Sequence, residues 1–315
     1  MEERAGKNKT IRTSVEEGRE YLERCVCVKE GQTLEQVLDR TLWGNMFEVC
    51  PLLPEKTVDL IIADPPYNLT KNYNGNRCQK KKAEEYEDYT RQWLRAVYPL
   101  LKEEGSIYVC CDWESSLIIG RVLSEMFQVR NRITWQREKG RGAKKNWKNG
   151  MEDIWFATKG SSYTFHLDAV KLRRKVLAPY RAEGVPKDWT ESEGNRYRDT
   201  CPSNFWDDIT IPFWSMAENT AHPTQKPEKL IAKILLASSS EGDVVLDPFL
   251  GSGTTSVTAR KLGRHYIGIE AEARYCVWAE QRLEAAETDT RIQGYQDGVF
   301  WERNSIPTEK KAGHL

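Results

Sequence analysis

The 315-residue chain predicts an α/β fold, with a mostly parallel sheet, helices on both faces and a smaller inserted module. Strand-like apolar runs alternate with segments of helical periodicity from residue 57 to about residue 287. Two of the strand-like runs end abruptly in loops rich in proline or glycine. The alternation weakens between about residues 161 and 221, where we expect the inserted module.

Each expected element follows from its own apolar pattern. β-branched and aliphatic runs predict strands at residues 57–64, 106–111, 129–135, 153–158, 243–247 and 265–269. Apolar residues at helical spacing predict helices at residues 86–100, 117–126, 227–240, 254–262 and 271–287, with a weaker pattern at 15–22. Pro227 suits the first turn of its helix.

Charge is balanced overall but unevenly distributed. The formal net charge is zero, with 47 basic and 47 acidic residues, which on average argues against a polyanionic partner. Between residues 130 and 148, however, Glu138 is the one acidic residue, and Glu-rich sequence follows Glu270. Such a basic run is typical of a solvated loop or of a DNA contact. Its basic residues are Arg130, Arg132, Arg137, Lys139, Arg141, Lys144, Lys145 and Lys148.

Cysteine usage and the N-terminus indicate the compartment. The eight cysteines lack the paired CxxC spacing of a zinc site, so we expect reduced thiols and no metal. The first 25 residues are charged where a signal peptide needs an apolar core, and no apolar run is long enough to span a bilayer. These features predict a cytoplasmic protein that does not enter a membrane.

A glycine-rich turn joins the strand at 243–247 to the following helix. In VVLDPFLGSGTTSVTARKLGRHYIGIE, Gly251 and Gly253 allow a tight turn and let a ligand approach the backbone. The next strand ends in Glu270, and a carboxylate there can accept hydrogen bonds from both hydroxyls of a ribose. The pattern predicts a ligand that contains adenosine.

A dinucleotide and a glycine turn without any ligand are the alternatives at this loop. Ser256 stands where the dinucleotide fingerprint has its third glycine or alanine. Asp247 would place negative charge beside a pyrophosphate, whereas a cationic sulfonium nucleoside tolerates that carboxylate. We therefore favour the sulfonium nucleoside.

The tetrapeptide Asp64-Pro65-Pro66-Tyr67 suits methylation of an amine conjugated to an aromatic ring. The Asp64 carboxylate and the Pro65 carbonyl can accept the two amine hydrogens, so that the nitrogen lone pair points at the methyl donor. Proline fixes the backbone, and the Tyr67 ring offers a face on which an extruded base can stack. A proline-stiffened loop with Tyr67 simply packed is the alternative interpretation.

Both motifs, with His222-Pro223-Thr224-Gln225-Lys226-Pro227 between them, make the chain resemble the β-class DNA amino-methyltransferases of restriction-modification systems. The resemblance covers about residues 44–287. It implies a Rossmann-like methyltransferase fold with a seven-stranded sheet, the cofactor S-adenosyl-L-methionine and a base flipped out of double-stranded DNA. The residue pattern and the resemblance together divide the chain into an N-terminal arm (1–41), a catalytic half (42–160), a target-recognition region (161–221), a cofactor-binding half (222–288) and a C-terminal tail (289–315).

The resemblance also implies roles for individual residues. It places Asp64, Pro65, Pro66 and Tyr67 at the target amine, and His222, Thr224 and Lys226 near the methionine end of the cofactor. The full predicted cofactor set is Ala63, Asp64, His222, Thr224, Lys226, Asp247, Pro248, Phe249, Gly251, Gly253, Thr254 and Glu270. We expect DNA contacts from Arg137, Lys139, Arg141, Lys144, Lys145 and Lys148. A homodimer and a separately encoded restriction endonuclease are further partners that the resemblance suggests.

Two details bear on the target base and on the cofactor. By the same resemblance, aspartate in the first position of the tetrapeptide favours N6 of adenine as the target. N4 of cytosine is the alternative, although the cytosine enzymes of the family more often carry serine there. Asn45 stands where members of the family commonly carry an aspartate near the cofactor adenine, which predicts altered affinity and retained activity.

Two other classes of function compete with this interpretation. An RNA or protein-amide methyltransferase uses similar chemistry, and a DNA-binding module could keep the fold without catalysis. The intact tetrapeptide and glycine turn argue against a pure binder. The predicted insert favours a long polyanion over a small substrate or a peptide because it is rich in aromatic and basic residues, namely Trp189, Arg196, Tyr197, Arg198, Trp206 and Trp214.

Overall fold

A mixed sheet forms the centre of the protein. The computed structural model describes residues 8–69, 71–73, 76–78, 80–137, 145–176, 181–182, 185–186, 188–192 and 195–303. Its largest sheet has the order β1-β15-β14-β2-β5-β7-β6-β13. These strands are β1 (Arg40–Trp43), β2 (Val58–Ala63), β5 (Leu101–Cys111), β6 (Gln128–Gln136), β7 (Met151–Thr158), β13 (Phe205–Trp206), β14 (Val244–Asp247) and β15 (His265–Glu270).

The mostly parallel sheet predicted from the sequence is confirmed, with two differences. β7 runs antiparallel to both of its neighbours, β5 and β6, so the sheet is mixed. In the described part of the chain the sheet has eight strands, one more than expected, because the two-residue β13 adds to the edge of β6. β1, at the opposite edge, pairs with β15 and spans the predicted boundary between the arm and the catalytic half, where the sequence predicted no strand.

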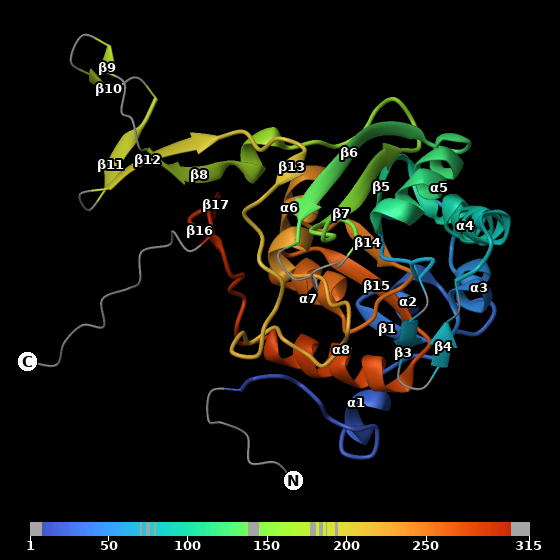
Figure 1. Ribbon diagram of the computed structural model, residues 1–315. Coiled ribbons are helices and arrows are strands. Elements are labelled where there is room, and N and C mark those ends of the chain that lie inside the picture. Colours follow the sequence, from blue (N-terminus) through green and yellow to red (C-terminus); the bar gives the residue numbers. More distant parts are fainter. Residues whose placement is uncertain are drawn as a thin grey trace, which may run out of the picture.

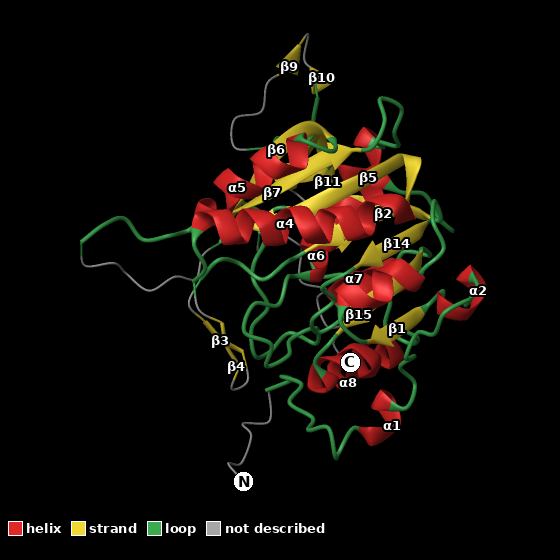
Figure 2. Ribbon diagram, turned by 90° about the vertical axis from the view of Figure 1, so that its right-hand side faces the viewer, coloured by secondary structure: helices red, strands yellow, loops and turns green. Residues whose placement is uncertain are grey.

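Helices cover both faces of this sheet, as predicted. The side chains of β2 alternate, so that Ile61 packs in one core with Trp93, while Leu60 packs in another with Leu230. Figure 2 shows α4 and α5 lying across the sheet on the first face. The helices are α1 (Arg19–Leu22), α2 (Leu34–Val37), α3 (Met46–Val49), α4 (Ala83–Val97), α5 (Trp113–Ser124), α6 (Glu228–Ser238), α7 (Thr254–Lys261) and α8 (Ala273–Ala285), with short 3₁₀ turns η1 (Cys50–Leu52), η2 (Tyr98–Leu100) and η3 (Leu167–Val170).

A second, five-stranded sheet has the order β11-β12-β8-β17-β16 and extends away from the main sheet (Figure 1). Its strands are β8 (Leu172–Lys175), β11 (Thr190–Ser192), β12 (Asn195–Thr200), β16 (Tyr295–Gln296) and β17 (Val299–Trp301). Two small hairpins complete the strands: β3 (Lys71–Tyr73) with β4 (Asn76–Cys78), and β9 (Arg181–Ala182) with β10 (Val185–Pro186).

The prediction that residues 289–315 are a tail is wrong for the described residues 289–303. β17 pairs in parallel with β8, and Phe300 is fully buried in a small core with Val170 and Leu172. The pattern VFW in β17 is too short for its strand character to show in the sequence alone. The predicted recognition region is therefore completed by chain from beyond the cofactor-binding half, and residues 304–315 lie outside the described residues.

The described part of the N-terminal arm packs on α8. The Trp278 indole nitrogen donates to the carbonyl of Thr13 at 2.8 Å, and the Tyr21 hydroxyl donates to Glu284 at 2.8 Å. Ile11 also forms a β-bridge with Thr220. These contacts attach the arm beside the cofactor-binding half.

Neither a membrane span nor a metal centre is present among the residues that the structure describes. In these ranges no helix combines the length and the apolar character that a bilayer crossing requires. The same ranges contain no group of three or more His, Cys, Asp or Glu side chains arranged to hold a metal ion.

Phe300→Ala is expected to destabilise the protein by about 3–5 kcal/mol, because it empties a fully buried position between β17 and the main body. Phe205→Ala is the matched control, since that ring is 52% exposed and its loss is expected to cost less than about 1 kcal/mol. Chemical denaturation measures both free energies of unfolding. Equal stabilities for the two variants would contradict the assignment of 295–301 to the folded core.

Candidate functional site

The two predicted motifs meet at one edge of the main sheet. β14 lies beside β2 in parallel, with Val245 opposite Leu60 and Leu246 opposite Ile61, so both strands end at the same edge. The loops that follow them, the tetrapeptide after β2 and the glycine turn after β14, line a single cavity of about 570 Å³. This position, outside the carboxyl ends of parallel strands, is where α/β proteins bind ligands.

The glycine turn is shaped by hydrogen bonds to an acidic side chain. Gly251 has a φ of 56°, and its N–H donates to Oε2 of Glu270 at 2.7 Å. A Cβ at this glycine would lie 3.2 Å from the His222 ring nitrogen Nε2. Oε1 of Glu270 accepts the N–H of Glu272 at 2.8 Å. Glycine is therefore required both for the backbone conformation and for the close approach of the histidine.

Two carboxyl groups on this cavity are poised between their charged and neutral forms. Burial raises the pKa of Glu270 to about 7, against the hydrogen bonds from Glu272 and Gly251, which lower it. Burial likewise raises the pKa of Asp247 to about 7, although Asp247 accepts hydrogen bonds from Thr255 and from the Phe249 N–H. A cationic ligand would favour the charged form of both groups.

The tetrapeptide forms a hydrogen-bonded group with Lys226 and Glu152. The Lys226 ammonium donates to Oδ2 of Asp64 at 2.6 Å and to the Tyr67 hydroxyl at 3.0 Å. The Tyr67 hydroxyl lies 2.9 Å from Oδ1 of Asp64 and 3.1 Å from Oε2 of Glu152. The Lys226 nitrogen lies 5.2 Å from the centre of the Tyr67 ring.

Charge and burial fix the protonation of this group. Burial lowers the pKa of Lys226, but the carboxylates of Asp64 and Glu152 outweigh burial and hold that pKa above its ordinary value. Burial, Asp64 and Glu152 together hold the pKa of Tyr67 well above its ordinary value. Lys226 is therefore a cation and Tyr67 a neutral hydroxyl at physiological pH.

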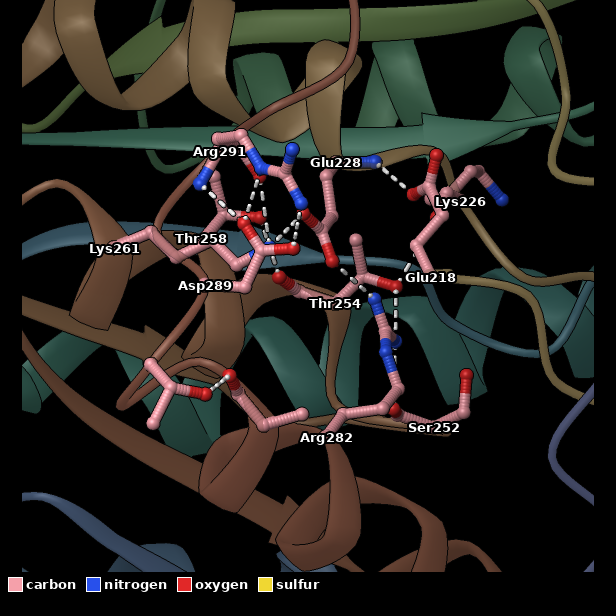
Figure 3. Close-up of polar contacts among 12 residues, drawn as sticks. Glu218, Lys226, Glu228, Ser252, Thr254, Thr258, Lys261, Arg282, Asp289 and Arg291 are labelled. Atoms are coloured by element: carbon pink, nitrogen blue, oxygen red, sulfur yellow. Dashed lines mark hydrogen bonds and ion pairs between the residues drawn. The ribbon is translucent and has the colours of Figure 1, made fainter. Parts of the chain in front are cut away.

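A buried polar network joins Lys226 to the glycine turn (Figure 3). The Thr254 hydroxyl donates to the Lys226 carbonyl at 3.0 Å, and Arg282 donates to Thr254 at 3.0 Å and to the Ser252 carbonyl at 2.8 Å. Arg282 also forms an ion pair with Glu228 at 2.9 Å. Because the same guanidinium holds both segments, the glycine turn and the lysine segment keep a fixed spacing.

Most of the predicted catalytic and cofactor-binding residues line the cavity, and two of them, Ala63 and Gly253, do not. Ala63 is fully buried and packs in the core between the sheet and α4. Gly253 has a φ of 85°, and a Cβ there would lie 2.7 Å from the Cβ of Ala279 on α8. The Gly253 position is needed for helix packing. The residues that line the cavity are Asp64, Pro65, Pro66, Tyr67, His222, Thr224, Lys226, Asp247, Pro248, Phe249, Gly251, Thr254 and Glu270.

Sequence patterns missed several residues at the site. Glu152 lies in β7, far along the chain from both motifs, and no local pattern indicates its contact with Tyr67. The cavity also includes Tyr89 and Tyr275, whose helical spacing in the sequence indicates only packing, and Phe47, which belongs to no predicted element. Asn45 lines the cavity and caps α3, since its Oδ1 accepts the Phe47 N–H at 3.0 Å. Asparagine at this position therefore has a structural role as a helix cap.

The predicted DNA-contacting loop is described only in part. Arg137 forms an ion pair with Glu152 and so extends the hydrogen-bonded group at the tetrapeptide. Lys145 and Lys148 are exposed, as is Trp147, whose side chain is 96% exposed. Lys139, Arg141 and Lys144 lie outside the described residues.

Aromatic residues of the insert divide between core and surface. Trp189, Tyr197 and Trp206 are buried, whereas Trp214 is 53% exposed. Arg196 lies over the Trp189 ring at 5.3 Å, and Arg198 pairs with Asp188 at 2.8 Å. Part of the aromatic and basic composition that suggested a polyanionic partner therefore stabilises the second sheet itself.

Residues 58–281 match a family model described as DNA methylase, of the N6 and N4 type. Two similar proteins illustrate the relationship. The chain is 33% identical over 249 residues to the type II methyltransferase M.HpaI of Haemophilus parainfluenzae, covering 78% of this chain and 74% of that protein. It is 35% identical over 250 residues to the DNA adenine methyltransferase YhdJ of Escherichia coli K12, covering 77% and 82%.

Solved structures agree on the fold. The chain is similar to the cytosine-N4-specific PvuII DNA methyltransferase, with a TM-score of 0.57, 19% identity, and coverage of 80% of this chain and 92% of that one. The putative DNA modification methylase TTHA0409 of Thermus thermophilus, in complex with S-adenosyl-L-methionine, has a TM-score of 0.53, 21% identity, and coverage of 85% and 99%. From its family match and its identity to the two relatives above, this chain belongs to the N6/N4 DNA methylase family.

Proposed function

We propose that the protein is a site-specific DNA methyltransferase that uses S-adenosyl-L-methionine to methylate N6 of an adenine flipped out of double-stranded DNA. The observation that carries the proposal is that Asp64 and Tyr67 share one cavity with Asp247 and Glu270. The similarity to an adenine methyltransferase of Escherichia coli supports adenine as the target base.

The cavity fits the proposed cofactor. Glu270 has two oxygens that each already accept one backbone N–H and keep a further lone pair for a ribose hydroxyl. Asp247, whose pKa burial raises to about 7, would gain a favourable interaction from a cation. The bound cofactor supplies an electrophilic methyl group on a sulfonium sulfur. Glu270, Asp247, Phe249 and the backbone of Gly251 would hold it.

The chain's own groups orient the target amine. An exocyclic amine is a poor nucleophile because its lone pair is delocalised into the ring, and hydrogen bonds to Asp64 and to the Pro65 carbonyl would favour a pyramidal nitrogen. Tyr67 offers its ring to the extruded base. Since a direct methyl transfer depends mainly on alignment, the fixed backbone of Pro65 and Pro66 contributes by holding these acceptors in place.

The second sheet and the basic loop are the proposed DNA-contacting parts. β8, β11 and β12 of the predicted recognition region form the second sheet together with β16 and β17, outside the main sheet (Figure 1), whereas β13 of the same region joins the edge of the main sheet. Arg137 forms an ion pair with Glu152, which contacts Tyr67, and Lys145 and Lys148 are exposed. Positive side chains beside an extruded base would neutralise the adjacent phosphates. A homodimer and a separately encoded endonuclease stay predictions from the resemblance.

DNA from cells that express the protein is expected to contain N6-methyladenine in one sequence context, and Asp64→Ala is expected to lower methylation by about 100-fold or more, because the amine loses an acceptor that aligns it. Mass spectrometry of nucleosides identifies the modified base, and single-molecule sequencing identifies the context. Duplex binding by the variant should persist.

Asp59→Asn is the matched control, since Asp59 lies at the other end of β2 and pairs with Lys102 at 2.7 Å. N4-methylcytosine in place of N6-methyladenine would contradict the choice of base. Methyl incorporation into RNA or protein alone would contradict the choice of substrate. Undiminished turnover in Asp64→Ala would contradict the mechanism.

Cofactor affinity is expected to rise with pH. Glu270 and Asp247, with pKa values raised to about 7, are largely protonated near pH 6 and ionised near pH 8. Because burial raises both pKa values, the free protein loses stability as the pH rises from about 4 through about 7, and a bound cation offsets this loss. The dissociation constant should therefore fall about three- to tenfold between about pH 6 and pH 7.5, with release of protons.

Isothermal titration calorimetry in buffers of different ionisation enthalpy measures both the affinity and the protons released. Glu270→Gln should bind the cofactor more weakly and show a smaller pH dependence. Glu241→Gln is the control because Glu241 is exposed and does not line the cavity. An unchanged pH dependence in Glu270→Gln would show that Glu270 does not titrate with binding.

A further inference from the structure

The Tyr67 hydroxyl has one hydrogen and two carboxylates that can accept it. Oδ1 of Asp64 lies at 2.9 Å and Oε2 of Glu152 at 3.1 Å. The Lys226 ammonium donates to the hydroxyl oxygen at 3.0 Å, so the hydroxyl hydrogen must be directed at one of the two carboxylates. The two arrangements differ by a rotation about the C–O bond of the tyrosine.

These two arrangements leave Asp64 in different states. With the hydrogen on Asp64, both carboxylate oxygens are engaged, because Lys226 already donates to Oδ2 at 2.6 Å. A donor that arrives at Oδ1 can then use only the lone pair that Tyr67 leaves, so the direction from which it can approach is restricted. With the hydrogen on Glu152, Oδ1 of Asp64 is available to an incoming amine.

The position of Glu152 requires an explanation. The residue is 5% exposed, and a buried carboxylate is costly unless it is paired and hydrogen-bonded. Arg137 forms an ion pair with one oxygen, and the other faces Tyr67 and lies 3.5 Å from the Lys226 nitrogen. Two anions and two cations, Asp64 and Glu152 with Lys226 and Arg137, thus balance within one cluster. The Glu152 carboxylate is therefore held by groups at or beside the tetrapeptide.

We propose that Glu152 is a positioning residue for methyl transfer, which accepts the Tyr67 hydroxyl hydrogen so that Asp64 can accept the target amine. The inference rests on the proposed function, since it concerns the amine that Asp64 holds. Arg137 fixes the orientation of the Glu152 carboxylate. Glu152 acts through Tyr67 and does not itself contact the substrate.

Glu152→Ala and Glu152→Gln test the proposal in the full-length protein, with duplex DNA that contains the modified sequence found by sequencing. Single-turnover methyl transfer should slow about tenfold or more in Glu152→Ala, while the dissociation constants for cofactor and duplex change less than about threefold. Glu152→Gln keeps an acceptor oxygen and the side-chain volume, so its rate should lie between those of wild type and Glu152→Ala.

A double-mutant cycle with Tyr67→Phe separates positioning from a structural role. Without the tyrosine hydroxyl there is no hydrogen to redirect, so Glu152→Ala should slow Tyr67→Phe by less than about threefold. A structural role would instead give the same loss in both backgrounds. Asp153→Asn is the matched control: Asp153 neighbours Glu152 on β7, is also buried, and points to Thr134, which donates to it at 3.0 Å. Its single-turnover rate should equal that of wild type.

The outcomes distinguish this inference from the proposed function. A wild-type protein that leaves adenine unmethylated contradicts the proposed function. If the wild type is active and both Glu152→Ala and Glu152→Gln are as fast as the wild type, the role of Glu152 is contradicted and the proposed function is not. An equal loss of rate in the two backgrounds of the cycle has the same meaning. If Glu152→Ala does not fold, the cycle is measured with Glu152→Gln. A Glu152→Gln variant that is as fast as the wild type would again contradict the role of Glu152.

Discussion

The parallel pairing of β2 with β14 is the constraint on which the site depends. These strands lie far apart in the sequence, yet their pairing brings their carboxyl ends to the same edge of the sheet. Asp64 follows the first strand and Asp247 ends the second, so the acceptor of the amine and the cofactor pocket share one cavity. A change of strand order would separate the two loops and leave each without a chemical role.

The same cavity contains two carboxyl groups, Asp247 and Glu270, whose charged forms are disfavoured by burial in the free protein. Burial raises the pKa values of Asp247 and Glu270, and Lys226 is a cation that interacts instead with Asp64 and Glu152. The site therefore has unequal halves: a charge-balanced group at the tetrapeptide, and at the glycine turn two carboxyl groups that accept hydrogen bonds from neutral donors. This inequality suits a cationic cofactor, because only the second group gains strongly from a positive charge.

The sequence predicted the central elements because their signals are local. β2, β14 and α6 have continuous apolar or helical patterns, and the tetrapeptide and Gly251 lie directly after strands. Glu152 could not be predicted as a site residue, because its contact with Tyr67 depends on how β7 pairs across the sheet. The second sheet was missed for a related reason: its strands are short, and β17 joins β8 from beyond the cofactor-binding half.

Helix α6 and the residues just before it contact both the second sheet and the tetrapeptide. Lys226, just before the helix, donates to Asp64, while Lys229 and Lys233 within it donate to Asp208, and Lys229 also donates to the carbonyl of Trp301 in β17. Burial lowers the pKa of Lys233 to about 8 against the attraction of Asp208, so this buried ion pair ties the helix to the insert at a cost in desolvation. The helix that begins two residues after Lys226 thus also supports the second sheet, through the contact of Lys229 with Trp301.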